Sequence, residues 1–157
     1  MCRLLGINPH TRARVWGSTK QILFVIISLM ADISSKKVLV VEDDVFLAQL
    51  LTNRIAKVGA QVLRAADGEE GVKIIKQSRP DLVLLDLILP KKSGFELLED
   101  MRSDPSTQGT PVIIVSNLGQ ESDVVRGKEL GAVEYFIKAK TSIDGLVERV
   151  KAILSEN

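Results

Sequence analysis

The sequence predicts an α/β fold in which a five-stranded parallel sheet carries helices on both faces. Two observations support this fold class. From residue 37 onward, short apolar segments alternate with stretches whose apolar residues recur at helical spacing, which is the pattern of βα units in series. In addition, residues 80–90 are almost entirely aliphatic, as expected of a strand that is buried on both faces. Right-handed crossovers then favour the strand order 2-1-3-4-5.

The predicted strands are short apolar runs separated by helical stretches. The second strand carries polar residues, so we expect it at an edge of the sheet, whereas the central strand ends near Asp86, a single charge within its aliphatic run. A carboxylate in such a run needs a metal ion, a partner or solvent at the strand end. The five strands are predicted at residues 38–41, 61–65, within 80–90, 111–115 and 133–137.

The predicted helices follow these strands and have recognisable ends. We expect Asp44 to cap the first helix, Gly59 to end it, and either Thr141 or Ser142 to cap the last one. Acidic residues after Asp67 complement the dipole at the start of the second helix. The five helices are predicted at residues 46–58, 67–75, 94–102, 120–130 and 143–154.

Composition places the chain among ordinary globular proteins. Of its 157 residues, 45% are hydrophobic and 26% are charged, and the formal net charge is +1. This charge gives no sign of nucleic-acid binding, and aromatic residues make up only 4% of the chain, too few for a base-stacking platform. The single cysteine, Cys2, excludes an intrachain disulfide and fits a reducing, cytoplasmic location.

Residues 1–35 differ from the remainder. They begin with a basic segment and continue into an apolar run at 22–31, which is shorter than the roughly 20 residues of a membrane-spanning helix. We expect residues 36–157 to form the folded domain and 1–35 to be a disordered extension, or a consequence of translation starting at Met30. A secretory signal or a membrane-surface anchor is the alternative, but no small-residue cleavage site follows, and we expect no stable membrane insertion.

Polar side chains follow four of the five predicted strands. Glu42 and Asp43 follow the first strand, Asp86 the third, Ser116 the fourth and Lys138 the fifth. Because the strands are parallel, these ends should meet at one edge of the sheet. Three neighbouring carboxylates repel one another and call for a cation, and an all-oxygen ligand set favours Mg²⁺. A capping or salt-bridged role for Asp86 is the alternative.

This arrangement is typical of phosphoryl transfer onto a carboxylate. Asp86 would act as the nucleophile and form an aspartyl phosphate. Mg²⁺ and Lys138 would offset charge on the transferred oxygens, and the Ser116 hydroxyl would supply a further contact.

Over about residues 36–155 the chain resembles the receiver domain of two-component response regulators, of the stand-alone type. The motifs that carry the resemblance are residues 40–44, 86–90 with Gly94 downstream, 115–116, 131–132 and 135–138. The resemblance implies the flavodoxin-like receiver fold and a signalling phosphoprotein rather than an enzyme. It implies that Asp86 takes a phosphoryl group from a sensor histidine kinase or a histidine phosphotransfer protein, in a phosphorelay that acts on a downstream protein target.

The same resemblance assigns roles to the other site residues. Glu42, Asp43, Asp86 and the backbone carbonyl of Ile88 would hold Mg²⁺, and Lys138 would assist the transfer. Ser116 and Tyr135 would change position on phosphorylation. The alternative for Tyr135 is a half-buried strand residue with its hydroxyl in water. A partner-facing surface or the core would then contain the apolar residues Val124, Val125, Leu130 and Val133.

The chain departs from the family after Lys138. Ala139 stands where the family usually has a proline with a cis peptide bond, so the loop is either trans and differently shaped or strained. Ile88 and Leu118 are bulky and apolar and cannot orient water, which predicts slow self-dephosphorylation. The alternatives to the switch are a degenerate receiver that acts as a phosphorylation-independent docking module and a phosphatase of the haloacid dehalogenase type. The latter needs a second aspartate where Ile88 stands.

Overall fold

Five parallel strands form the centre of the computed structural model, which describes residues 22–23 and 33–156. The sheet order is β2-β1-β3-β4-β5, which confirms the predicted fold class and strand order. Every neighbouring pair is parallel, so all carboxyl ends lie at one edge. The strands are β1 (Lys37–Val41), β2 (Gln61–Ala65), β3 (Leu82–Leu85), β4 (Val112–Ser116) and β5 (Glu134–Ile137).

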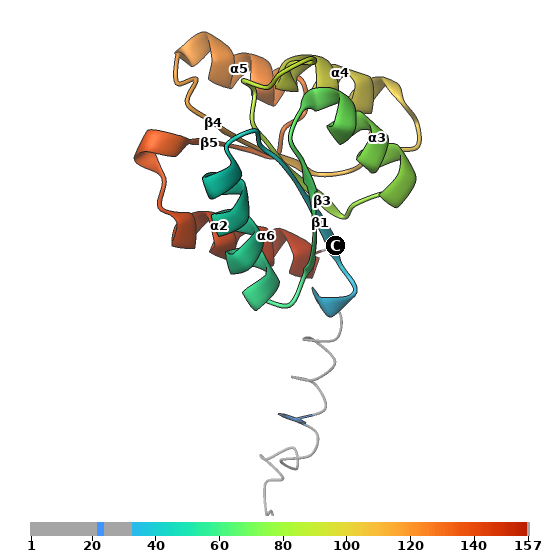
Figure 1. Ribbon diagram of the computed structural model, residues 1–157, viewed down its shortest axis with the longest axis vertical. Helices are drawn as coiled ribbons and strands as arrows, with labels where there is room; N and C mark the ends of the chain where they lie inside the picture. Colours follow the sequence, from blue (N-terminus) through green and yellow to red (C-terminus); the bar gives the residue numbers. More distant parts are fainter. Residues whose placement is uncertain (1–21, 24–32, 157) are drawn as a thin grey trace, which may run out of the picture.

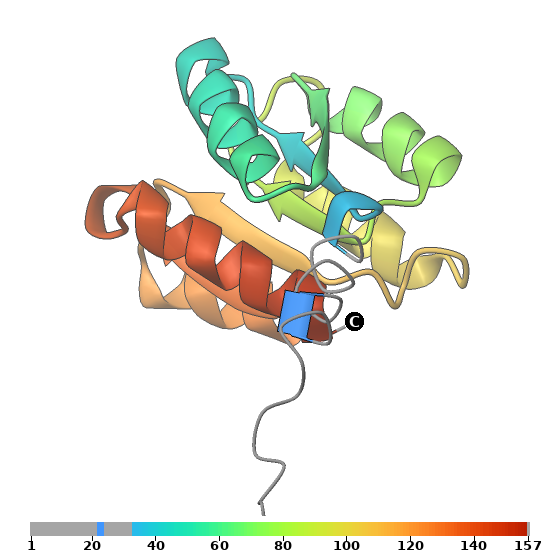
Figure 2. The same ribbon diagram turned by 90° about the horizontal axis from the view of Figure 1, so that it is seen from below.

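Helices cover both faces of this sheet. Figure 1 shows α2 and α6 together on one face, and α3, α4 and α5 along the other. The view from below separates α2 and α6 from α3 and α4 in the same way (Figure 2). The helices are α2 (Val45–Lys57), α3 (Gly68–Ser78), α4 (Gly94–Ser103), α5 (Glu121–Glu129) and α6 (Ile143–Glu156), and the short 3₁₀ helix η1 spans Lys138–Lys140.

The sheet divides the core in two, as the alternation of side chains along a strand requires. In β1, Val38 and Val40 belong to the cluster beneath α2 and α6, whereas Leu39 and Val41 belong to the cluster beneath α3 and α4. All four residues are at most 1% exposed. The central strands are therefore buried on both faces, which explains why their sequences are continuously aliphatic.

Capping bonds set where the helices begin. The Asp44 carboxylate accepts bonds from the backbone amides of Phe46 and Leu47 at 2.9 and 3.0 Å, which confirms its predicted role as an N-cap. Ser142 caps α6, since its hydroxyl accepts a bond from the Gly145 amide at 3.1 Å. After α2, Gly59 has a φ of 106°, a left-handed conformation that glycine adopts without strain.

Strand β3 covers residues 82–85 of the aliphatic run and ends directly before Asp86, which agrees with the predicted place of Asp86 at the strand end. Two other details differ from the sequence prediction. Strand β4 ends with Ser116, one residue later than predicted. Placing Val125 and Val133 in the core is wrong, because they are 46% and 50% exposed. Both lie in or next to the elements at the β5 edge of the sheet, where one side has no further strand to cover it.

The predicted extension at residues 1–35 lies mostly outside the described residues, and so does Met30. Within it, Ile33 is 7% exposed and packs in the cluster beneath α6, so the folded core reaches three residues ahead of the expected boundary at 36. Ile22 and Leu23 are half-exposed. Within the described part of the chain, no helix is both long and apolar enough to cross a membrane.

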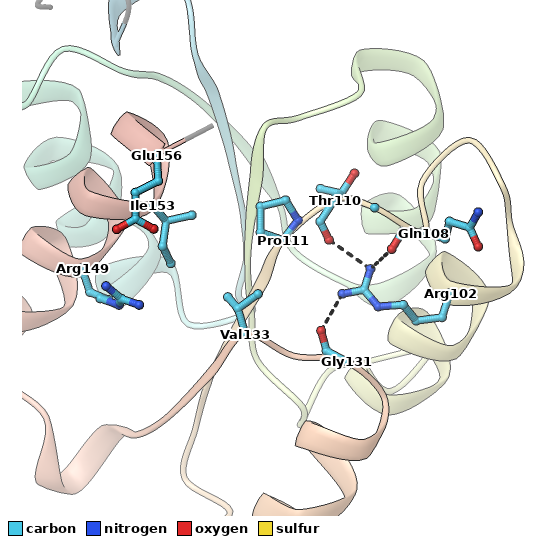
Figure 3. Close-up of a pocket in the computed structure, with 10 residues that line it drawn as sticks. Arg102, Gln108, Thr110, Pro111, Gly131, Val133, Arg149, Ile153 and Glu156 are labelled. Carbon is cyan, nitrogen blue, oxygen red and sulfur yellow. Dashed lines mark hydrogen bonds between the residues drawn. The ribbon is translucent and has the colours of Figure 1, made fainter.

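One arginine organises the amino edge of the sheet. The Arg102 guanidinium donates to the backbone carbonyls of Gln108 and Thr110 at 2.7 and 3.0 Å, and to those of Leu130 and Gly131 at 3.2 and 2.9 Å. It therefore ties the loop before β4 to the turn before β5. Figure 3 shows three of these bonds at the wall of a cavity of about 570 Å³, whose lining also includes Pro111, Val133, Arg149, Ile153 and Glu156.

Candidate functional site

The carboxyl edge of the sheet brings together the polar residues that were predicted to meet there. Glu42 directly follows β1, Asp86 follows β3, Ser116 ends β4 and Lys138 follows β5. Their strands lie in the order β1-β3-β4-β5 and are parallel. The site therefore follows from topology, since each side chain needs only a strand end to reach it.

Three carboxylates lie within reach of one ion. An oxygen from each of Glu42, Asp43 and Asp86 lies within 4.8 Å of the others. Glu42 and Asp86 are 4% and 5% exposed, whereas Asp43 is exposed. A set of only oxygen ligands, with an open side at Asp43, suits a hard cation that keeps some of its waters, such as Mg²⁺. The donor set therefore fits the predicted ion.

Lys138 joins two of these carboxylates. Its Nζ lies 2.6 Å from Asp86 Oδ2 and 2.8 Å from Glu42 Oε2. Burial raises the pKa of Glu42, and the bond from Lys138 only partly opposes this. Burial alone would lower the pKa of Lys138, but the bonds to Asp86 and Glu42 outweigh it and the pKa is raised. One ammonium therefore faces two buried carboxylates, and the site retains an excess of negative charge.

The Asp86 carboxylate is oriented from both sides. Asp86 Oδ1 accepts a bond from the Ile88 amide at 3.1 Å, while Oδ2 is held by Lys138. The Asp86 amide donates to the Val41 carbonyl at 3.0 Å, which continues the β1–β3 ladder by one residue. A Cβ on Gly94 would lie 2.2 Å from the Asp86 carbonyl oxygen, so only glycine lets α4 start this close to Asp86.

The loop that follows Asp86 is tied to α3 by an ion pair that the sequence did not predict. Lys91 has a φ of 64° and donates to Asp67 Oδ2 at 2.6 Å. Asp67 Oδ1 meanwhile accepts from the Glu70 amide at 2.8 Å and caps α3. Lys91 and Asp67 are 24 residues apart, so no local pattern signals the pair.

The two residues predicted to respond to phosphorylation meet at one backbone position. The Ser116 hydroxyl is fully buried and accepts a bond from the Leu118 amide at 3.3 Å. The Tyr135 hydroxyl donates to the Leu118 carbonyl at 2.8 Å. The hydroxyl thus has a backbone partner, while the side chain is half-buried on its strand, as the alternative also expected.

The lysine loop is trans. No peptide bond in the described part of the chain is cis, and Lys138, Ala139 and Lys140 form the 3₁₀ turn η1. Of the two possibilities that the alanine left open, the trans loop is the one observed. It still brings Lys138 Nζ to Asp86.

Comparisons with known proteins agree on one family. The model of the response regulator receiver domain matches residues 38–151. The chain is 36% identical to Protein PilH of Pseudomonas aeruginosa over 119 residues, which cover 76% of this chain and 98% of PilH. It is 34% identical over 123 residues to the Cyanophora paradoxa protein named "Probable transcriptional regulator ycf27". The match covers 78% of this chain but only 50% of that protein, so the chain spans about half the length of such curated relatives.

Solved structures give the same result. The receiver domain of the Francisella response regulator 1452 superposes with a TM-score of 0.72 at 31% identity, covering 78% of this chain and 98% of that one. The BeF₃-activated N-terminal receiver domain of Klebsiella pneumoniae RstA gives a TM-score of 0.69 at 31% identity, over 76% and 98% of the two chains. The match to the family model spans most of the folded residues and includes every predicted strand. The chain therefore belongs to the response regulator receiver domain family.

Proposed function

We propose that this chain is a phosphorylation-dependent switch that takes a phosphoryl group on Asp86 and passes the signal on through protein contacts. The donor would be a sensor histidine kinase or a histidine phosphotransfer protein. The observation that carries the proposal is the placement of Asp86, a buried carboxylate at the end of the central strand with an ammonium 2.6 Å away and two further carboxylates beside it. As a receiver, the chain is a signalling phospho-acceptor rather than an enzyme.

Mg²⁺ fits this site on the chemistry of its donors. Glu42, Asp43 and Asp86 would hold the ion through their carboxylates, and the Ile88 carbonyl would complete the protein ligands. When bound, the ion would screen the negative charge of the carboxylates and of an incoming phosphoryl group.

Residues of the chain itself orient the Asp86 carboxylate for its attack on phosphorus. An oxygen of the Asp86 carboxylate forms the new bond to phosphorus, while the bond from phosphorus to the donor histidine nitrogen breaks and the imidazole keeps the electron pair. The bonds from the Ile88 amide and Lys138 fix the plane of the carboxylate before the reaction. Lys138 also carries the positive charge that offsets the charge on the transferred oxygens.

Phosphorylation of Asp86 would change the hydrogen bonding of Ser116 and Tyr135. A phosphoryl group adds a charge of about −1.5 to −2 and strong acceptor oxygens. The Ser116 hydroxyl is a suitable donor for one of them, and its movement would alter its bond with the Leu118 amide. Tyr135 holds the carbonyl of the same residue, so the two side chains are coupled through Leu118.

Incubation with acetyl phosphate and MgCl₂, followed by intact-mass measurement, tests this proposal. We expect one added phosphoryl group in the wild-type chain and none in Asp86→Asn. Asp44→Asn is the matched control, because Asp44 caps α2 and asparagine is an equally good cap, so this variant should still be phosphorylated. A wild-type chain without an Asp86-dependent adduct would favour the docking module instead.

A further inference from the structure

Helix α5 is attached to the sheet by a narrow contact. Within Glu121–Glu129 the one buried residue is Gly127. Its neighbours in the helix are exposed or half-buried, and Val125 is 46% exposed. The closest approach of α5 to the sheet is therefore made at a residue without a side chain.

Gly127 lies directly against the ring of Tyr135. A Cβ added to Gly127 would lie 2.7 Å from Cδ1 of Ile114 on β4, and 3.0 and 3.2 Å from Cδ2 and Cε2 of Tyr135 on β5. Carbon atoms in contact lie about 3.5–4.0 Å apart, so even a methyl group at this position requires a neighbour to move.

The two neighbours differ in how easily they can move. Ile114 is 0% exposed in the cluster beneath α3 and α4, where close packing leaves little room for rearrangement. Tyr135 is half-buried on the edge strand β5, and its ring packs against the rim of the same core. The Tyr135 ring is the more easily displaced of the two, because it can turn toward solvent about its side-chain bonds, whereas the contact with Ile114 is relieved only within the core.

We propose that Gly127 is a positioning residue for Tyr135: its missing side chain is what lets the ring lie beneath α5 with the hydroxyl on the Leu118 carbonyl. A methyl group at 127 forces the ring to shift by a few tenths of an ångström, which strains that bond, and a larger side chain displaces the ring further. The consequence for signalling rests on the proposed function, because Tyr135 matters as a switch only if Asp86 is phosphorylated.

The choice of glycine at this position runs against the needs of the helix. Alanine is the more favourable residue in a helix interior, so α5 by itself would be stabilised by Gly127→Ala. A displaced tyrosine in a folded variant therefore reports the local contact with Gly127 rather than a weakened helix.

The chain has one tyrosine, so 3-fluorotyrosine gives a single ¹⁹F signal that reports Tyr135 alone. We expect the wild-type resonance to shift in Gly127→Ala toward the position of a solvent-exposed tyrosine. The double variant Gly127→Ala with Ile114→Val removes the 2.7 Å contact in the core while keeping the contact with the ring, so it should show the same displaced signal. Gly109→Ala is the matched control, since a Cβ there meets no atom within 4 Å.

A second readout uses the phenol itself. Burial, followed by the charges of Asp123 and Asp86, raises the pKa of Tyr135. Tyrosinate absorbance of the unlabelled protein should therefore show a lower pKa in both Gly127→Ala variants than in the wild type or in Gly109→Ala. An unchanged ¹⁹F resonance and an unchanged pKa in both Gly127→Ala variants would overturn the inference.

The phosphoryl adduct is measured by mass on the same samples, which separates this inference from the proposed function. Absence of an Asp86 adduct would refute the switch, while the position of the ring in untreated protein would still decide the role of Gly127. If the adduct forms, its effect on the ¹⁹F signal should be large in the wild type and lost in Gly127→Ala.

Discussion

At the carboxyl edge of the sheet Lys138 is shared by two buried carboxylates, whereas at the amino edge Arg102 donates to four neutral backbone carbonyls. Both cations are buried enough for desolvation to act on them, but the outcome differs. The carboxylate partners raise the pKa of Lys138 above its ordinary value, whereas burial lowers the pKa of Arg102.

The difference shows how one sheet can carry a reactive edge and a structural edge. The carboxyl edge holds more negative than positive charge. This excess attracts a cation, and the cation can then neutralise a further anionic group. At the amino edge the Arg102 donors are matched by carbonyls that carry no net charge, so this cluster leaves no excess of negative charge for an ion. We therefore expect the two edges to respond differently to Mg²⁺, acid and salt.

The largest effect is expected for Lys138→Met, which removes the ammonium but keeps much of the side-chain volume. Without Mg²⁺ the variant should lose about 3 kcal/mol of unfolding free energy, because two buried carboxylates are left without their partner. Phosphorylation by acetyl phosphate should slow roughly 100-fold, as is typical when one charge-stabilising donor is lost. Urea denaturation and mass-monitored phosphorylation measure the two effects.

Mg²⁺ makes that test specific to the carboxyl edge. A ligand that binds only the folded state raises its stability, and loss of the competing ammonium should strengthen ion binding. We therefore expect Mg²⁺ to stabilise Lys138→Met more than the wild type. Equal stabilisation of both proteins would mean that Lys138 and the ion do not share the Glu42 and Asp86 oxygens.

A smaller and Mg²⁺-independent loss is expected for Arg102→Ala at the amino edge. Hydrogen bonds to a charged group contribute about 1.5–3 kcal/mol each in favourable cases. Since these four carbonyls are partly accessible to water, we expect a total loss of about 2 kcal/mol. Arg102→Lys keeps the charge but lacks the planar fork, so it should recover only part of the loss. If Arg102→Ala slowed phosphorylation of Asp86 as well as lowering stability, the two edges of the sheet would not be independent of each other.

Acid provides the third test, through the Asp67–Lys91 pair beside the acceptor loop. The bond from the Glu70 amide, and then the one from Lys91, lower the pKa of Asp67 below its ordinary 3.8. A lowered folded-state pKa contributes stability that is present above 3.8 and disappears as the pH falls through the folded value. Asp67→Asn keeps a capping side chain but loses this charge.

The wild type should therefore be more stable than Asp67→Asn at neutral pH, and the difference should shrink as the solution is acidified below 3.8. Denaturation curves across this range, with and without Mg²⁺, measure it. Mg²⁺ should leave the stability difference unchanged, because Asp67 is not one of the three carboxylates of Glu42, Asp43 and Asp86. A stability difference that grows on acidification would mean that the folded-state pKa of Asp67 is raised rather than lowered.

The carboxyl edge was largely predictable from sequence, and the amino edge was not. Asp86 and Lys138 could be placed together because parallel strands end at one edge, so order along the chain translates directly into proximity. Arg102 carries no comparable signal, since its four acceptors are backbone carbonyls and any residue supplies one. The exposure of Val125 and Val133 escaped prediction for a related reason. An apolar residue at the rim of a sheet has the same sequence appearance as one in the core.

The smallest effect is expected for Arg149→Ala, which also lies at the amino edge and lines the same cavity as Arg102 (Figure 3). Its partner is Glu134 at the start of β5, and the two side chains are 41% and 26% exposed. Partly exposed ion pairs contribute about 0–1 kcal/mol and weaken as salt is added. Arg149→Ala should thus cost less than about 1 kcal/mol in low salt and almost nothing in molar salt, whereas the loss in Arg102→Ala should persist. If salt instead removed the Arg102 effect and spared that of Arg149, the amino edge would depend on charge pairing, and the contrast between the two edges would fail.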